Sequence, residues 1–204
     1  MIPTKITVSL CAICLVSACG GSSDTTPVIT APTPTTFETN AIANANGTFT
    51  VESDGRTVEL PASSFFSNGQ PSWFSGDLRA SAFDDADVLA IGGIDADGTF
   101  HGIAGTPTAL SGSADFTGRW AVNSTTSQRS GPLELAYNFD AQSLTTSTGM
   151  LEVTGTVNDD GTISGSVDFE GAQADFEGGF FGGDTAAGAF SNDTIGGIFY
   201  GTQD

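Results

Sequence analysis

The chain has 204 residues, enough for one domain, and a formal net charge of −19 from 24 acidic and 5 basic side chains. This balance excludes nucleic-acid binding and anionic-lipid binding through a basic surface, because both need clustered Lys or Arg side chains. The self-repulsion of so large a charge favours a soluble monomer.

The first 18 residues are typical of an export signal. Lys5 precedes an uncharged apolar run, and this run is too short to span a bilayer, which needs about 20 apolar residues. The run ends in Val16-Ser17-Ala18-Cys19, which resembles the lipobox of bacterial lipoproteins. That resemblance implies a lipoprotein signal peptide over residues 1–18, cleavage before Cys19, and a diacylglycerol on its thiol. An ordinary signal peptide with an incidental cysteine is the alternative.

The residues after the cysteine indicate where the protein is sorted and how it is tethered. Gly20 stands where an aspartate favours inner-membrane retention in enterobacteria, so we expect an outer-membrane or cell-surface location. Residues 19–38 are rich in Ser, Thr and Pro and have little apolar surface to bury. They predict a lipidated, disordered linker.

Beyond residue 40 the chain is typical of strand and turn. Asp54-Gly55, Asp97-Gly98 and Asp160-Gly161 separate apolar or β-branched runs and predict hairpins with type I′ turns, which need positive φ at both central residues. Asn46-Gly47 and Asn68-Gly69 are further turn candidates. No stretch keeps a helical period, and 27 glycines would weaken any helix.

In residues 112–204 apolar side chains alternate with polar ones. The apolar positions are Ala114, Phe116, Trp120, Val122, Leu133, Leu135, Tyr137, Phe139, Leu151, Val153, Val157, Ile163, Val167, Phe169, Ala174, Phe176 and Phe180. This pattern predicts an all-β fold, an antiparallel up-and-down barrel of about eight strands with one apolar and one wet face. A membrane-spanning barrel has the same alternation, but the lipid anchor and the glycine content favour a water-soluble barrel with a filled interior.

Four segments of this region, in order, resemble the β-barrel domain of transferrin-binding protein B and related bacterial surface lipoproteins. They are residues 112–120, 135–144, 161–165, and a closing Gly-x-Phe-x-Gly pattern that spans 176–201. The resemblance implies a single-barrel member, because the chain has no room for two barrel-plus-handle lobes. Residues 39–111 match less well, and we expect them either to supply further barrel strands or to form a small handle-like sheet.

His101 is the only histidine. It is expected to be a surface or rim residue without a cofactor; the alternative is a haem or metal ligand, with Tyr137, Tyr200 or Met150 as a second haem ligand. Asp95-Ala96-Asp97-Gly98 resembles the start of a calcium loop, but a strand resumes at once, so a turn is expected.

Acidic residues offer two weaker hypotheses. The acidic run at Asp84, Asp85 and Asp87 is either a divalent-cation site or, as we expect, a solvated loop. Paired carboxylates suitable for a glycosidase arise by chance among 24 acids, and no catalytic motif is present, so a hydrolase is the least favoured function.

The sequence as a whole favours a non-enzymatic, lipid-anchored surface protein that captures a protein or small ligand through loops at one barrel end. The candidate loops are residues 123–132 and 63–77. Phe65, Phe66, Trp73 and Phe74 are expected under or beside the barrel. Of Phe180 and Phe181, one should fill the core and the other cover an edge or a contact patch.

Mass spectrometry of the protein purified from its native membrane tests the anchor. We expect a chain that begins at Cys19 and carries fatty chains there, since each buried CH₂ contributes about 0.8 kcal/mol to membrane attachment. A product that begins elsewhere, or that has an unmodified thiol, contradicts this assignment.

Overall fold

The computed structural model describes residues 37–204, except for 64 and 139. The predicted signal peptide, Cys19 and the linker as far as residue 36 lie outside the described residues. The regular structure of the described part consists of sixteen β-strands. It contains no helix of the length and hydropathy that crossing a membrane requires.

The last eight strands close into a barrel. Each strand pairs antiparallel with the next along the chain, and the last pairs with the first. This confirms the predicted all-β, up-and-down, eight-stranded barrel. Its strands are β9 (Ala114–Ser124), β10 (Gln128–Asn138), β11 (Ser143–Thr148), β12 (Leu151–Val157), β13 (Thr162–Phe169), β14 (Ala172–Phe181), β15 (Thr185–Ser191) and β16 (Ile195–Gln203).

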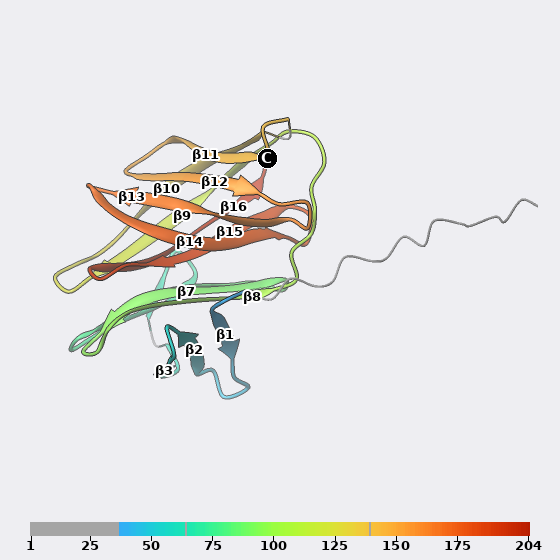
Figure 1. The fold of residues 1–204 in the computed structure, drawn as a ribbon. Helices are drawn as coiled ribbons and strands as arrows, with labels where there is room; N and C mark the ends of the chain where they lie inside the picture. The colour runs from blue at the N-terminus through green and yellow to red at the C-terminus, as the bar shows by residue number, and fades with distance from the viewer. Residues whose placement is uncertain (1–36, 64, 139) are drawn as a thin grey trace, which may run out of the picture. The chain divides into compact units, whose positions relative to one another are not determined.

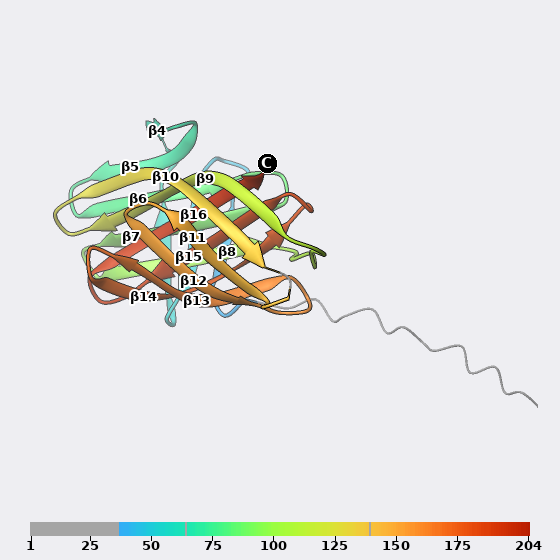
Figure 2. The same ribbon diagram turned by 90° about the horizontal axis from the view of Figure 1, so that it is seen from above.

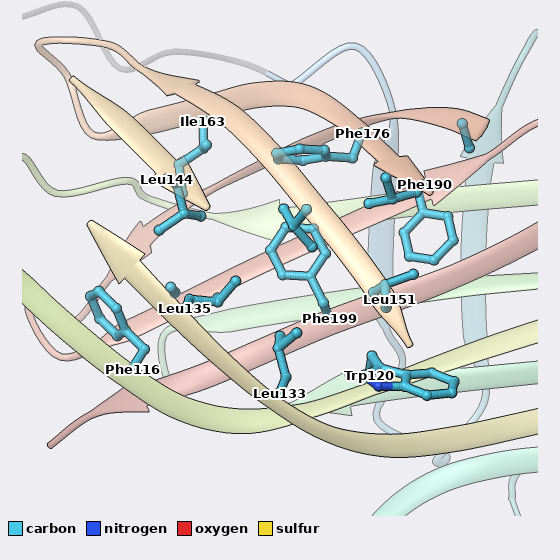
Figure 3. Packing of buried hydrophobic residues seen from close by; sticks show 14 of the residues in the cluster. Phe116, Trp120, Leu133, Leu135, Leu144, Leu151, Ile163, Phe176, Phe190 and Phe199 are labelled. Atoms are coloured by element: carbon cyan, nitrogen blue, oxygen red, sulfur yellow. The ribbon is translucent and has the colours of Figure 1, made fainter. Parts of the chain in front are cut away.

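Apolar side chains from all eight strands fill the barrel interior, as the alternation predicts (Figure 3). The ring of Phe180 lies 5.5 Å from that of Phe116 and 5.0 Å from that of Tyr137, between centroids. Inward-facing glycines make room for such rings; a Cβ on Gly155 would lie 2.8 Å from the ring of Phe176. Phe139, predicted to point inward, lies outside the described residues.

The first eight strands form two sheets apart from the barrel. A three-stranded sheet has the order β1-β2-β3, and a five-stranded sheet has the order β4-β5-β6-β7-β8. The strands are β1 (Asn40–Ala43), β2 (Phe49–Ser53), β3 (Arg56–Leu60), β4 (Phe65–Ser67), β5 (Gln70–Ser75), β6 (Leu78–Asp84), β7 (Val88–Asp95) and β8 (Gly98–Gly105).

The five-stranded sheet packs between the barrel and the three-stranded sheet (Figure 1). β7 is therefore apolar on both faces: Val88 and Ala90 belong to the cluster that contains barrel residues, and Leu89 and Ile91 to the cluster that contains β1–β3. Strands buried on both faces have near-continuous apolar runs for this reason.

The same packing corrects the prediction of one wet face around the barrel. The outward side chains of β15 and β16 include Ala187, Ala189 and Ile198, and all three are buried against the five-stranded sheet. The sequence shows this only as small apolar residues on both sides of these two strands, where alternation is lost.

The prediction for Phe180 and Phe181 is correct for Phe180, which fills the core, but Phe181 is fully buried and covers neither an edge nor an exposed patch. Phe180 lies inside the barrel, and Phe181 is buried in the layer outside it. The ring of Phe37 packs at 6.2 Å from that of Phe181, between centroids. The last residues of the predicted linker therefore contact the folded domain.

Glycines allow the five-stranded sheet and the barrel to approach each other backbone to backbone. A Cβ on Gly92 of β7 would lie 2.2 Å from the carbonyl oxygen of Gly197 in β16, and a Cβ on Gly196 would lie 2.2 Å from that of Gly93. Neither distance is compatible with a side chain, so the crossing of β7 over β16 requires glycine on both strands.

The predicted turns are correct in position but not always in type. Asp54-Gly55 and Asn68-Gly69 have positive φ at both residues, as type I′ requires. At Asp97-Gly98 and Asp160-Gly161 only the glycine has positive φ. The backbone N–H of Gly161 donates to the carbonyl of Asn158, and that of Gly47 donates to the carbonyl of Asn44, so these two loops are longer than a two-residue turn. In the third loop Asp95 pairs with Gly98, so the two turn residues are 96 and 97.

Gly92→Ala should lower the free energy of unfolding by about 1–3 kcal/mol, because its methyl group forces β7 away from β16. Urea unfolding measures the change. Ser166→Ala, at an exposed position of β13, is the control and should stay within about 0.5 kcal/mol of the wild type. Equal stability of Gly92→Ala and the wild type would show that the strands do not touch.

Candidate functional site

Residues 63–77, predicted as a loop, form the β4–β5 hairpin at the edge of the five-stranded sheet. The type I′ turn at Asn68-Gly69 joins the two strands. A run of polar and aromatic residues folds as a hairpin because its turn residues accept positive φ and its aromatic residues suit an extended backbone.

Three phenylalanines of this hairpin are exposed to solvent. Phe65, Phe66 and Phe74 are 56%, 58% and 64% exposed. Because Phe65 pairs with Ser72, Phe65 and Phe74 lie on one face of the hairpin and Phe66 on the other; we call Phe65 and Phe74 the aromatic hairpin surface.

The prediction that all four aromatic residues here lie under or beside the barrel is correct for Phe65, which lines a cleft together with barrel residues, and wrong for Trp73. Only Trp73 is buried, and it packs edge-on against Phe49, at 5.4 Å between ring centroids, under the three-stranded sheet.

A groove borders the aromatic hairpin surface. It has a volume of about 580 Å³ and is lined by apolar residues that include Pro61, Leu78 and the rings of Phe65 and Phe74. The guanidinium of Arg79 lies 5.0 Å from the centre of the Phe74 ring, a cation–π contact. The surface therefore combines exposed aromatic area with an adjoining recess.

Residues 123–132, the second predicted loop, are mostly strand, because β9 runs to Ser124 and β10 starts at Gln128. Their polar side chains bind the five-stranded sheet. The amide nitrogen of Asn123, which is fully buried, donates to the carbonyl of Gly92 at 3.0 Å. Gln128 donates to the Asn123 side-chain oxygen at 2.8 Å and to the carbonyl of Ala80 at 2.9 Å.

The two candidate loop regions, residues 63–77 and 123–132, nevertheless lie beside each other. A cleft of about 160 Å³ lies between the β4–β5 hairpin and strands β9 and β10, and Figure 2 shows these elements side by side. Its two charged lining residues are Arg119 and Arg129. No sequence motif predicts that these two arginines belong to a site. The one signal in the sequence is that cationic residues are scarce in so acidic a chain.

His101 is half-buried and joins three parts of the fold. Its Nδ1 lies 2.8 Å from the hydroxyl of Ser191, and its Nε2 lies 3.7 Å from a carboxylate oxygen of Glu177. That carboxylate also accepts from the backbone N–H of Glu38 and of Thr39, each at 2.9 Å, and from the Thr39 hydroxyl. Together they form one wall of a cleft of about 700 Å³.

The residues proposed as second haem ligands lie elsewhere. Tyr137 is inside the barrel, Tyr200 stacks on Phe83 outside it at 4.0 Å between ring centroids, and the Met150 sulfur lies 3.8 Å from Arg129. None of the three lines the His101 cleft.

The acidic residues considered as cation ligands do not form a metal site either. Within the described residues, no three His, Cys, Asp or Glu side chains form a group that could hold a metal ion. Asp95 pairs with Arg56 at 3.0 Å and accepts from the backbone N–H of Asp97 at 2.9 Å, which fixes the 95–98 turn. Burial and the neighbouring Asp85 raise the pKa of Asp84.

His101 should make stability depend on pH. Burial lowers the pKa of His101, and the carboxylates of Glu177 and Asp54 oppose that effect, so the ring is neutral near pH 7 and its contact with Glu177 is not an ion pair there. Below the ordinary pKa of about 6.5 the unfolded chain holds the additional proton, and the free energy of unfolding falls as the pH falls.

His101→Asn removes this titration and keeps a hydrogen-bonding group for Ser191. We expect its free energy of unfolding, measured in urea between pH 7 and pH 5, to fall less steeply than that of the wild type. Parallel profiles would contradict the assignment.

Comparisons with known proteins give structural similarity only. No protein-family model matches the chain, and no characterised protein matches its sequence significantly. The fold is similar to the haemoglobin receptor HpuA from Kingella denitrificans, in its apo form (12% identity, 81% of this chain and 85% of that chain, TM-score 0.48) and in complex with human haemoglobin (14%, 84% and 90%, TM-score 0.47).

The fold is also similar to the isotype 1 transferrin-binding protein B from serogroup B Neisseria meningitidis, with 14% identity over 80% of this chain and a TM-score of 0.49. The chain spans 42% of the length of that protein. The family that residues 112–204 were expected to resemble is therefore among those to which the fold is similar.

Proposed function

We propose that this chain is a lipid-anchored protein of the outer membrane or cell surface that binds a partner protein, without catalysis, through the aromatic hairpin surface. The anchor is the lipid predicted on Cys19. The observation that carries the proposal is the exposure of Phe65 and Phe74 on one face of a short hairpin.

Exposed aromatic area of this kind favours association. Burying a phenylalanine side chain contributes about 1.5–3 kcal/mol relative to leaving it in water. Contiguous apolar patches on soluble domains mark interaction sites, and large aromatic residues are frequent anchors in protein interfaces. Because the rings of Phe65 and Phe74 are more than half exposed at a sheet edge, the surface suits a protein better than a small ligand.

The geometry of His101 does not favour the carrier alternative. Both ring nitrogens face protein groups, Ser191 and Glu177, and the ring is 14% exposed. A haem or metal ion would have to displace one of these contacts.

Photo-crosslinking in the cells that make the protein tests the proposal. Benzoyl-phenylalanine is placed at Phe65 or Phe74 of the full chain, and at Ile42 as a control. Ile42 is also an exposed apolar residue, but it lies on β1 in the other sheet. We expect an adduct of one defined mass from both hairpin positions and none from Ile42.

The identified partner is then purified and its affinity for variants is measured. Phe65→Ser and Phe74→Ser should each weaken binding by roughly tenfold or more, as loss of an interface anchor does, whereas Ile42→Ser should not. The absence of an adduct at both hairpin positions, or equal affinity of all three variants, would exclude this surface.

A further inference from the structure

The cleft between the β4–β5 hairpin and the barrel has an electrostatic character opposite to that of the chain. The protein has 24 Asp and Glu side chains against 5 Lys and Arg, yet none of the cleft's lining residues is acidic and two are arginines. The other polar groups lining it are hydroxyls and amides, from residues such as Ser72, Gln70 and Tyr200.

The two arginines differ in how they are neutralised. Arg129 pairs with Glu170 at 2.7 Å and lies over the ring of Phe169. Arg119 is half-buried, and its partner is the neutral amide of Asn68: in the amide orientation that satisfies both groups, the Asn68 oxygen accepts from Nε and Nη2 at 3.1 Å each. In the described part of the chain the arginine ion pairs are those of Arg56 and Arg129.

The bonds to Asn68 leave part of the Arg119 guanidinium available. The group has five N–H donors in a planar fork that matches the two oxygens of a carboxylate. Two of them point at the Asn68 oxygen, and the three others remain for a further partner. The charge also acts on the cleft wall: burial raises the pKa of Tyr200, and Arg119 opposes that rise.

The size of the cleft limits the ligand. About 160 Å³ is less than a drug-sized molecule needs, so the cleft accommodates one small group. Phe65, Ala82 and Ile198 supply apolar wall beside the arginines. The matching ligand therefore has an anionic end and a short apolar part.

We propose that this cleft is a binding site for a carboxylate group, with Arg119 as its ion partner and Asn68 as the residue that orients the guanidinium. The carboxylate comes either from a small organic acid or from an acidic side chain of another protein. The inference does not depend on the aromatic hairpin surface having a partner, because it rests on the cleft alone.

Titrations followed by NMR at the arginine Nε–H resonances test the site. The protein is the mature chain with Cys19→Ser. Sodium benzoate represents a free organic acid, and a glutamate blocked at both backbone ends represents a side chain. Benzamide and blocked glutamine are their neutral counterparts. The Arg119 resonance is assigned by its loss in Arg119→Gln.

We expect a saturable shift of the Arg119 resonance with at least one of the two carboxylates, with a Kd on the order of 1 mM, and none with its neutral counterpart. In Arg119→Gln the affinity, followed by the tyrosine ring resonances, should fall roughly tenfold or more, because a charge-assisted pair is lost. Arg119→Lys should fall less. Arg56→Gln, which removes an arginine paired with Asp95 elsewhere, should stay within about twofold of the wild type.

Saturation by benzoate alone indicates a small organic acid, and saturation by blocked glutamate alone indicates a protein side chain; either supports the site. Failure of both carboxylates to saturate would overturn it. So would equal binding of the neutral amides, or wild-type affinity in an Arg119→Gln protein whose thermal unfolding midpoint is unchanged.

Discussion

The crossing of β7 over β16 is the constraint on which the rest of the arrangement depends. At Gly92 and Gly197 the two backbones approach so closely that a side chain has no space. Close approach alone would let one strand slide along the other. Hydrogen bonds prevent this, because the fully buried Asn123 donates to the carbonyl of Gly92 and accepts from Gln128. A buried amide that loses such partners costs about 1–3 kcal/mol, so the five-stranded sheet is held on the barrel in one register.

That register positions both candidate surfaces. The five-stranded sheet extends past the barrel wall, and its edge hairpin is left with Phe65 and Phe74 in solvent and with Asn68 facing Arg119. Phe65 also lines the small cleft that the hairpin closes against β9 and β10, so the two candidate surfaces are adjacent. A protein that binds through a hairpin benefits from a rigid support, because less conformational freedom is lost on association.

How far the sequence predicts this structure depends on what each residue contacts. The barrel was predictable because residues such as Phe116 and Val153 alternate with polar neighbours and all point into one core. The burial of Ala187 was not, because it results from contact with a sheet far away in the chain. Asn123 and Gln128 suggested a loop by their polarity, yet they are polar to satisfy carbonyls of another sheet. The turn at Asn68-Gly69 was predictable because both residues accept positive φ. The exposure of the hairpin's rings was not predictable, since the pattern of a strand does not show whether it lies at the edge of a sheet.

The contacts of Glu177 have a mechanical consequence. The chain enters the domain at Phe37, and its next two residues donate backbone hydrogen bonds to this carboxylate on β14. Tension applied along the incoming chain therefore reaches the closed barrel before it reaches β1, whose pairing with β2 is only four residues long. A closed barrel has no free edge from which strands can peel, so the short β1–β2 pairing is shielded from shear.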